Sequence, residues 1–185
     1  MKTVGIDEVG RGCWAGPLVA GAVLLTTPIA GLKDSKQLTK KQREALAIII
    51  REQAVAWGLG WVEAATIDAI GLTAAVRLAM RRALEQITPD FDEVIIDGHM
   101  NFLEALPKTS ALIKADDLVP AVSAASILAK VARDKYMSTL DPRYDVYEFA
   151  KHVGYGTVLH LEKLKLYGVS DLHRRSYKPI RALIQ

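Results

Sequence analysis

Short apolar runs bounded by turn residues predict five β-strands in this 185-residue chain. The first two runs, at residues 2–7 and 17–25, are joined by a glycine-containing turn, and such a connection favours an antiparallel pair. The remaining runs lie at residues 54–62, 93–97 and 111–114. Two glycines within residues 54–62 weaken the strand signal there, because glycine has no side chain to pack across a sheet.

Apolar residues at helical spacing predict four helices between and after these strands. The segments are residues 39–53, 67–87 with a break at Gly71, 120–139 and 157–167. In the first of them, Leu46, Ile49 and Ile50 fall on one face, and Thr39 is suited to cap the N-terminus. Strands that alternate with helices predict an α/β fold in which helices cover a mixed sheet.

The composition is that of an ordinary globular protein, with 50% apolar and 24% charged residues. No apolar run reaches the length of a membrane span, so no membrane partner is expected. The N-terminus carries no export signal, and the single cysteine, Cys13, forms no internal disulfide. Both features favour a reducing, cytoplasmic location.

Charge is distributed unevenly along the chain. Residues 151–185 carry seven Lys/Arg and two Asp/Glu, a net charge of +5, whereas residues 1–150 carry 17 and 19, a net charge of −2. An acidic body with a basic tail suits a nuclease, in which carboxylates hold metal ions and cations contact phosphates. A basic tail that is merely solvated fits the same counts.

Four acidic residues stand at or just beyond the ends of predicted strands: Asp7 and Glu8 after the first, Asp97 after the fourth, and Asp116 after the fifth. Strand-end loops of an α/β sheet are common positions for functional sites. Carboxylates brought together there repel one another unless a cation neutralises them, and such oxygen ligands favour Mg²⁺ or Mn²⁺. The pattern predicts a metal-dependent phosphoryl hydrolase and nothing narrower.

Each of these acids also fits an ordinary structural role. Asp97 and the glycine after it form a common turn pair, and Asp116 is suited to cap a following helix. Asp7 and Glu8 are adjacent, and adjacent strand residues point to opposite faces of a sheet. Both can therefore serve one site only if the strand bends or ends there.

The turn Gly10-Arg11-Gly12 follows the first two acids directly. Its glycines let backbone N–H groups approach a ligand closely, and Arg11 is suited to meet a phosphate. No Lys-Ser/Thr pair follows at the spacing of a phosphate-binding Walker loop. A hairpin turn with an exposed arginine fits this stretch equally well.

Longer sequence blocks carry a more specific signal. They are GIDEVGRGCWAGPLVAGAV (5–23), GLKDSKQL (31–38), IIDG (95–98), KAD (114–116), SAASILAKVARDK (123–135), GYGT (154–157) and HRRS (173–176). With these blocks, the chain strongly resembles the bacterial and archaeal ribonuclease HII family over nearly its whole length. The resemblance implies a ribonuclease H-like catalytic domain over residues 1–140 and a small C-terminal helical, substrate-binding segment over residues 141–185.

The resemblance implies an endoribonuclease that hydrolyses the RNA strand of RNA/DNA hybrids and cleaves 5′ of single ribonucleotides in duplex DNA. Two-metal-ion hydrolysis would leave 3′-hydroxyl and 5′-phosphate ends, and the role would be ribonucleotide removal from DNA. Asp7, Glu8, Asp97 and Asp116 match the family's metal-binding and catalytic carboxylates, with Mg²⁺ or Mn²⁺ as cofactor. We expect a monomer, since a nuclease of this size reaches a duplex alone, and the sequence supports no prediction either way about a sliding-clamp partner.

Further positions match the family's substrate contacts. Gly10, Arg11 and Gly12 match the turn that recognises the ribose 2′-OH, and Tyr155 matches the tyrosine that packs against the following sugar. The family's contacts to the nucleic-acid backbone are matched by Ser35, Lys36 and the run His173-Arg174-Arg175. Val153 stands where the family usually has lysine, which removes one phosphate-seeking charge beside Tyr155.

Three alternatives stay open from the sequence. The related ribonuclease HIII type carries an additional N-terminal domain, whereas the first strand here is predicted from residue 2. A hybrid-binding protein without catalysis is disfavoured by the presence of all four carboxylates. A phosphatase acting on small molecules fits the carboxylates but leaves the basic tail and Tyr155 unexplained.

Overall fold

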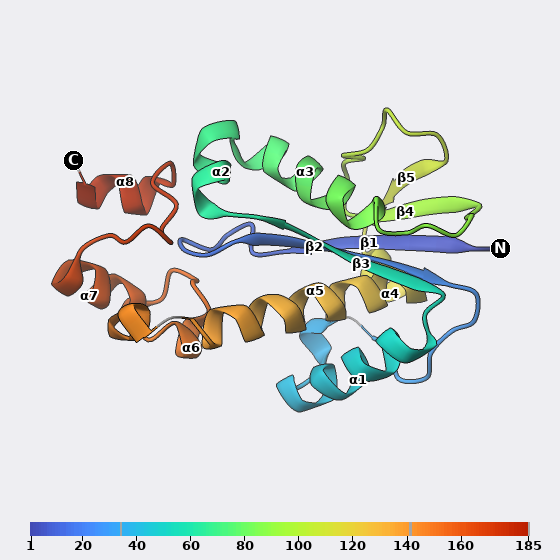
Figure 1. Ribbon diagram of the computed structural model, residues 1–185, viewed down its shortest axis with the longest axis horizontal. Helices are drawn as coiled ribbons and strands as arrows, with labels where there is room; N and C mark the ends of the chain where they lie inside the picture. The colour runs from blue at the N-terminus through green and yellow to red at the C-terminus, as the bar shows by residue number, and fades with distance from the viewer. Residues whose placement is uncertain (34, 141, 185) are drawn as a thin grey trace.

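A five-stranded mixed sheet forms the centre of the protein (Figure 1). The computed structural model describes residues 1–33, 35–140 and 142–184. In spatial order, the strands are β3 (Ala56–Val62), β2 (Leu18–Leu25), β1 (Thr3–Val9), β4 (Glu93–Asp97) and β5 (Thr109–Leu112). β2 pairs antiparallel with β1 and β3, whereas β4 pairs parallel with β1 and β5. The carboxyl ends of β1, β4 and β5 therefore lie at one edge of the sheet.

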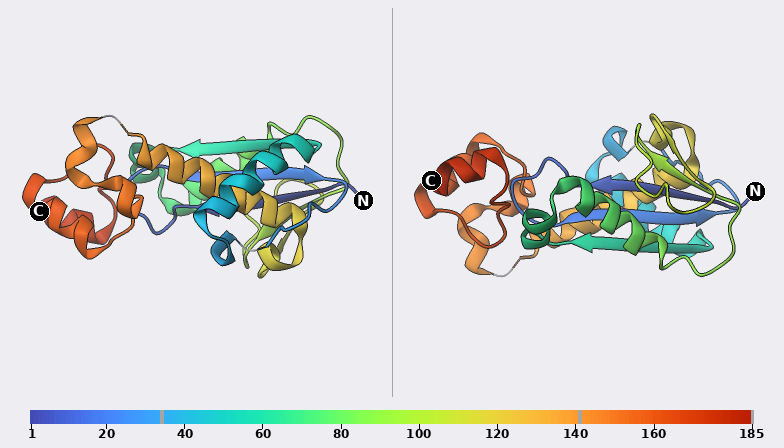
Figure 2. Two further views of the ribbon diagram at one scale, coloured as in Figure 1. Left: turned by 90° about the horizontal axis from the view of Figure 1, so that it is seen from below. Right: turned by 90° about the horizontal axis from the view of Figure 1, so that it is seen from above.

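Helices cover both faces of this sheet, as Figures 1 and 2 show. α3 (Leu72–Leu84) lies on one face, and α5 (Pro120–Ser138) lies with α1 (Lys40–Gln53) on the other. The shorter helices are η1 (Ser35–Gln37), α2 (Ala64–Ile70), α4 (Ala115–Leu118), η2 (Pro142–Tyr147), α6 (Phe149–His152), α7 (Val158–Tyr167) and α8 (Lys178–Ile184). Within the described ranges, no helix has the length and apolar composition needed to cross a membrane.

Two glycines bring α5 against the sheet. A Cβ atom on Gly5 of β1 would lie 2.1 Å from the carbonyl carbon of Ala121, and one on Gly21 of β2 would lie 2.4 Å from the oxygen of Ala125. A larger residue at either position would push the helix away, because side-chain carbons do not approach a backbone so closely. This close crossing sets Ser126 of α5 beside the end of β1.

The predicted α/β architecture is confirmed, and all five predicted strands form. The strand over residues 54–62 forms because its glycines serve packing: a Cβ atom on Gly60 would lie 1.9 Å from the carbonyl oxygen of Ala79 in α3. The predicted cap of α1 is also confirmed. The Thr39 side chain accepts a hydrogen bond from the Gln42 N–H (3.3 Å), and the Thr39 N–H donates to the Gln42 side chain (2.8 Å).

Several predicted boundaries are wrong. The first strand continues to Val9, since its pairing with β2 extends past the two acids. The fifth strand covers Thr109–Leu112 and not residues 111–114, because the left-handed backbone of Lys114 (φ 59°) ends the extended chain and opens the unpredicted helix α4. The second predicted helix begins three residues earlier, at Ala64, and ends at Leu84.

The C-terminal helices gather around a hydrophobic cluster of their own at the far end of α5 (Figure 2). Its buried members are Ala15, Met137, Tyr144, Tyr147, Phe149, Leu164 and Ile180. Ala15 and Met137 belong to the preceding part of the chain, so the C-terminal segment packs on that part through apolar side chains. The predicted domain boundary at residue 140 stays a prediction.

Candidate active site

Three aspartates from neighbouring elements meet at the edge of the sheet where β1 and β4 end. Asp7 lies in β1, Asp97 is the last residue of β4, and Asp116 lies in α4, which follows β5. The parallel register pairs Ile6 with Ile96, which places Asp7 and Asp97 at adjacent positions. One carboxylate oxygen from each of the three aspartates lies within 4.8 Å of the other two.

Glu8 lies beside this group but is not one of its three members. β1 continues through both acids and does not end between them, yet Asp7 and Glu8 line one cleft. Asp7 accepts a hydrogen bond from Ser126, whereas Glu8 Oε1 accepts one from Arg11 Nη1 (2.9 Å). Glu8 Oε2 is buried and has no hydrogen-bond partner among the described residues. One oxygen of Glu8 is thus left for a ligand.

Burial and mutual repulsion disfavour the charged forms of these acids. Burial, followed by the nearby charges of Glu8 and Asp97, raises the pKa of Asp7 to about 8. Burial also raises the pKa of Glu8 above its ordinary value, although Arg11 opposes this. A divalent cation would favour the ionised carboxylates. The oxygen-only donor set and the unpartnered Glu8 oxygen fit a hard cation of the Mg²⁺ or Mn²⁺ type.

A cleft of about 380 Å³ opens beside the acids and brings most of the predicted substrate-binding residues together. Besides Asp7, Glu8 and Asp97, its lining includes Gly10, Arg11, Gly12, Ser35, Lys36, Arg43, Ser126, Lys130 and Tyr155. Residues separated by more than 140 positions in the sequence therefore face one space. Its polar, cationic walls beside a carboxylate cluster suit a phosphate-containing ligand.

Two fully buried arginines hold the Gly10-Arg11-Gly12 turn from behind. Arg174 Nη1 donates to the carbonyl oxygens of Gly10 (2.6 Å) and Arg11 (3.2 Å), and its Nε donates to that of Gly16 (3.1 Å). Arg133 packs against Gly10 so closely that a Cβ atom there would lie 2.5 Å from the arginine Nε. The backbone of the turn is therefore fixed by contacts to the protein interior and is not a loose hairpin.

This arrangement corrects the role predicted for Arg174. Its side chain is fully buried and occupied by backbone carbonyls, so it cannot contact a nucleic-acid backbone. His173 is also buried. Arg175 is exposed, while its backbone N–H donates to Asp68 (2.8 Å), and it does not line the cleft. The physical reason is that the segment turns inward at residues 173–174 and outward at residue 175.

The Gly-Tyr-Gly segment approaches the turn from the C-terminal part of the chain. Tyr155 lines the cleft, and burial, with a further contribution from Cys13, raises its pKa to about 12. The flanking glycines are required: a Cβ atom on Gly154 would lie 2.4 Å from the carbonyl oxygen of Ala15, and one on Gly156 would lie 2.1 Å from the Trp14 ring. The tyrosine is therefore presented by a segment locked against residues 14–15.

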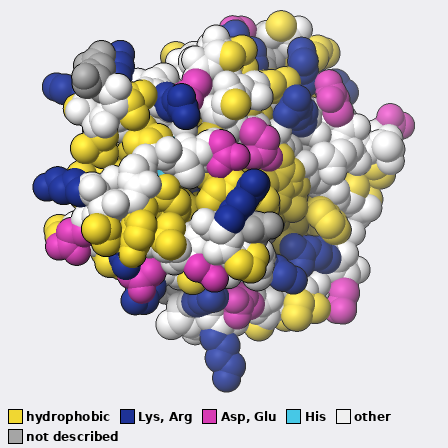
Figure 3. All heavy atoms as spheres, turned by 60° about the vertical axis from the view of Figure 1, so that its left-hand side comes forward, with side chains coloured by type: hydrophobic (Ala, Val, Ile, Leu, Met, Phe, Trp, Pro, Cys, Tyr) yellow, Lys and Arg dark blue, Asp and Glu magenta, His cyan; other side chains and the backbone are white. Residues whose placement is uncertain are grey.

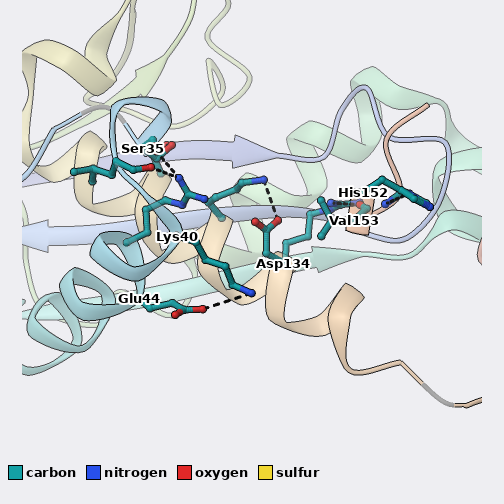
Figure 4. A network of polar contacts seen from close by, with 12 residues as sticks. Ser35, Lys40, Glu44, Asp134, His152 and Val153 are labelled. Atoms are coloured by element: carbon teal, nitrogen blue, oxygen red, sulfur yellow. Dashed lines mark hydrogen bonds and ion pairs between the residues drawn. The ribbon is translucent and has the colours of Figure 1, made fainter. Parts of the chain in front are cut away.

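The Ser35–Lys36 pair closes another side of the cleft. The Ser35 hydroxyl lies 3.0 Å from that of Ser126, and Lys36 Nζ lies 3.4 Å from Asp116 Oδ2. Arg43 Nη1 donates to the carbonyl oxygen of Ser35 (3.0 Å), which ties this segment to α1 (Figure 4). Lys36 thus lines the cleft and also pairs with one of the three clustered aspartates.

The comparisons with known proteins agree with this geometry. The family model for ribonuclease HII matches residues 4–180. The chain belongs to the ribonuclease HII family. It is 47% identical over 184 residues to the ribonuclease HII of Halorhodospira halophila, covering 98% of this chain and 94% of that protein. It is 46% identical to the ribonuclease HII of Nitrosococcus oceani, covering 100% and 92%.

Solved structures of ribonucleases share the fold of this chain. The ribonuclease H2 of Pyrococcus horikoshii superposes with a TM-score of 0.82 at 28% identity, covering 99% of this chain and 97% of that one. The ribonuclease HII of Archaeoglobus fulgidus, solved in complex with PCNA, gives 0.81 at 26% identity, with 96% of each chain covered. A Bst ribonuclease HIII solved with Mn²⁺ shares the fold alone, with a TM-score of 0.77 at 20% identity, covering 100% and 69%.

Sequence reasoning missed three polar residues that line the cleft, namely Arg43, Ser126 and Lys130. Ser126, Lys130 and Arg133 follow one another at spacings of four and three, so they lie on one face of α5. That spacing was the available signal, but lysine and arginine on a helix usually indicate a solvated face. Lys130 pairs with Asp134 (2.9 Å; Figure 4) and also lies 5.6 Å from the centre of the Tyr155 ring.

The predicted basic C-terminal tail is less concentrated in space than in sequence. Seen from the C-terminal side, Lys and Arg side chains are scattered among apolar and acidic ones (Figure 3). Arg174 is buried, while Lys151 and Lys163 both pair with Glu148, at 2.5 and 3.2 Å. Part of the positive charge of residues 151–185 is therefore buried with Arg174. Another part is paired with Glu148, which lies just before that range.

Proposed function

We propose that this protein is an endoribonuclease that cleaves RNA in RNA/DNA hybrids and cuts on the 5′ side of single ribonucleotides embedded in duplex DNA. The observation that carries the proposal is the cleft in which Asp7, Glu8 and Asp97, with Asp116 close by, face the Gly10–Gly12 turn and Tyr155. Membership of the ribonuclease HII family supports it. The corresponding role is removal of ribonucleotides from DNA.

The four carboxylates Asp7, Glu8, Asp97 and Asp116 are proposed to hold Mg²⁺ or Mn²⁺. When bound, two such cations would orient the scissile phosphate, activate water and stabilise the charge on the leaving oxygen. The chain's own contribution is to fix the carboxylates: the Ala115 N–H holds Asp97 Oδ1 (2.8 Å), and Ser126 holds Asp7. Hydrolysis would leave 3′-hydroxyl and 5′-phosphate ends.

The turn and the tyrosine are proposed to recognise the junction between ribonucleotide and deoxyribonucleotide. Apart from Gly12 itself and its two chain neighbours, no atom of the described residues lies within 4 Å of a Cβ atom built on Gly12, so its backbone is open to close approach by a ligand. A 2′-OH is both donor and acceptor and can meet backbone groups there, while the Tyr155 ring can pack on the next sugar. Lys36 and Arg175 would contact phosphates, and the buried Ser35 would shape the wall.

The test uses duplex DNA that contains one labelled ribonucleotide, with an all-DNA duplex of the same sequence as control. The protein is incubated with Mg²⁺, with Mn²⁺ or with chelator, and the ends of the products are mapped. We expect one metal-dependent cut on the 5′ side of the ribonucleotide and none in the control. Asp97→Asn should lower cleavage by about 100-fold or more, because the amide cannot supply the charge that a cation requires.

The remaining outcomes separate the alternatives. Cleavage of a long hybrid without a cut at the single ribonucleotide would favour ribonuclease HIII-like specificity. Binding of hybrid in a gel shift without cleavage would favour a binding protein. Asp97→Asn with full activity would remove that residue from the site. A cytoplasmic location and a monomeric state remain predictions. The Archaeoglobus fulgidus relative was solved in complex with PCNA, and we predict no such partner for this chain from that structure.

A further inference from the structure

A chain of buried histidines connects the C-terminal loop to the Gly-Tyr-Gly segment. His173 and His160 have exposed fractions of 1% and 0%, and their Nε2 atoms lie 3.0 Å apart. His160 Nδ1 lies 2.9 Å from the carbonyl oxygen of Tyr155. At the other end, the Ser170 N–H donates to His173 Nδ1 (3.0 Å). Neither ring lines the cleft.

The partners of the chain determine where its protons are. His173 Nδ1 faces the Ser170 N–H (3.0 Å), which can only donate, and the Ser170 hydroxyl (2.8 Å), which can donate as well, so an unprotonated Nδ1 accepts from both and His173 Nε2 carries the proton. His160 Nε2 then accepts that proton's hydrogen bond, which leaves His160 Nδ1–H to donate to the Tyr155 carbonyl. In this arrangement each ring nitrogen faces a partner of the opposite kind, and both imidazoles are neutral.

The chain ends on the backbone of the residue proposed to read the sugar. The Tyr155 carbonyl also accepts from the Thr157 N–H (2.9 Å), and the Tyr155 N–H donates to the carbonyl of His152 (2.9 Å; Figure 4 shows the His152–Val153 region). The residue following His173 is Arg174, which holds the Gly10-Arg11-Gly12 turn. One short segment therefore supports both recognition elements from inside the protein.

We propose that His160 and His173 are positioning residues for substrate recognition, acting through the backbone of Tyr155. This inference rests on the proposed function, because it assigns Tyr155 to the sugar next to the ribonucleotide. Removing the His160 donor would leave the tyrosine carbonyl held by the Thr157 N–H alone, which weakens the control of its orientation and of the ring in the cleft. The carboxylate group does not touch either histidine, so hydrolysis of a substrate that does not depend on Tyr155 is retained.

The surroundings support neutral rings. Burial lowers the pKa values of His160 and His173 to about 4, and the ring of His152, stacked on His160 at 4.4 Å, acts in the same direction. Backbone hydrogen bonds of Tyr155 at His160 and of Ser170 at His173 oppose the lowering of the two pKa values, as does Asp171 at His173, but they do not reverse it. A charged His160 would place two N–H donors 3.0 Å apart at its contact with His173, which breaks the chain.

The test is a double-mutant cycle between His160→Phe and Tyr155→Ala, with kcat/KM measured on the single-ribonucleotide duplex and on a long RNA/DNA hybrid. We expect His160→Phe to lower kcat/KM on the single ribonucleotide by about tenfold in the natural background, and by less than about twofold in the Tyr155→Ala background. His160→Asn keeps an N–H at the Nδ1 position and should restore activity to within about threefold. Thermal melting confirms that each variant is folded at the assay temperature.

Equal losses in the two backgrounds would overturn the inference, because they would show that His160 acts without Tyr155. If His160→Phe does not fold, the same cycle is run with His173→Leu, with His173→Gln as the conservative variant that retains the donor. A natural protein that cuts the long hybrid but not the single ribonucleotide would overturn the proposed function and this inference together. A natural protein that cuts the ribonucleotide, with an additive cycle, would overturn the inference alone.

Discussion

The contribution of His160 to stability should depend on pH. Its folded-state pKa is about 4, below the value near 6.5 of an exposed histidine, so the unfolded chain binds more protons between these values. Stability from the buried neutral ring is therefore present at pH 7.5 and lost as the pH falls toward 4. At pH 5.5 an unfolded histidine is about nine-tenths protonated, and linkage gives a loss of about 1 kcal/mol relative to pH 7.5.

The prediction is best measured as a difference between two proteins. Asp7 and Glu8 have raised pKa values, so their effect on stability runs opposite to that of the histidines. Asp7 and Glu8 are present in both the natural protein and the His160→Phe variant. Their effect on the pH dependence of stability therefore cancels when the two proteins are compared. We expect the variant to be less stable at pH 7.5, and we expect the gap in unfolding free energy to narrow by about 1 kcal/mol at pH 5.5.

Urea unfolding followed by tryptophan fluorescence, with chelator present and ionic strength held constant, would give the two free energies at pH 7.5, 6.5 and 5.5. The matched control is His99→Phe, since His99 is an exposed loop residue and the control shows the effect of replacing a histidine with phenylalanine outside the buried chain. A gap that stays constant or widens toward pH 5.5 would refute the reasoning, because it would mean that His160 is charged in the folded protein.

Three further comparisons test the site. Gly10→Ala should lower the free energy of unfolding by about 2 kcal/mol, because φ is +92° and the new Cβ would meet Arg133. Gly12→Ala should fold normally, and its rate of cleavage at a single ribonucleotide should fall about tenfold. Arg174→Met should lower the free energy of unfolding in urea by about 3 kcal/mol, because it leaves buried carbonyls unpaired. Arg175→Met should leave stability unchanged and weaken binding of the duplex, because Arg175 is exposed. Val153→Lys should tighten duplex binding at low salt and steepen the slope of log K against log salt by about 0.9.

The strands and the carboxylate group could be predicted from local sequence because each depends on short-range pattern. Apolar runs mark the strands, and Asp7 and Asp97 stand where such runs end, so the parallel pairing of β1 with β4 brings them together. The position of Asp116 was predicted, but the helix that presents it was not. It depends on the left-handed backbone of Lys114, and lysine gives no sequence signal for that conformation.

The buried polar residues could not be predicted, because their partners lie far away in the chain. Arg174 bonds the carbonyl of Gly10 at a separation of 164 residues, and Arg133 bonds that of Pro17 at 116. A basic pair in a polar segment usually lies at the surface, and nothing local distinguishes Arg174 from Arg175. The same holds for the histidine chain, whose meaning appears only when α7 and the loop after it are packed against Tyr155.

The choice of arginine at the two buried positions follows from what they hold. Arg133 donates to the carbonyl oxygens of Pro17 (2.8 Å), Ala15 (3.0 Å) and Val153 (2.8 Å), so one planar fork joins the start of β2 to the Gly-Tyr-Gly segment. Arg174 does the same for the glycine turn. A lysine has a single ammonium and cannot reach three carbonyls in one plane. Both guanidiniums are fully buried. They therefore stiffen the two recognition elements and leave the cleft surface to the ligand.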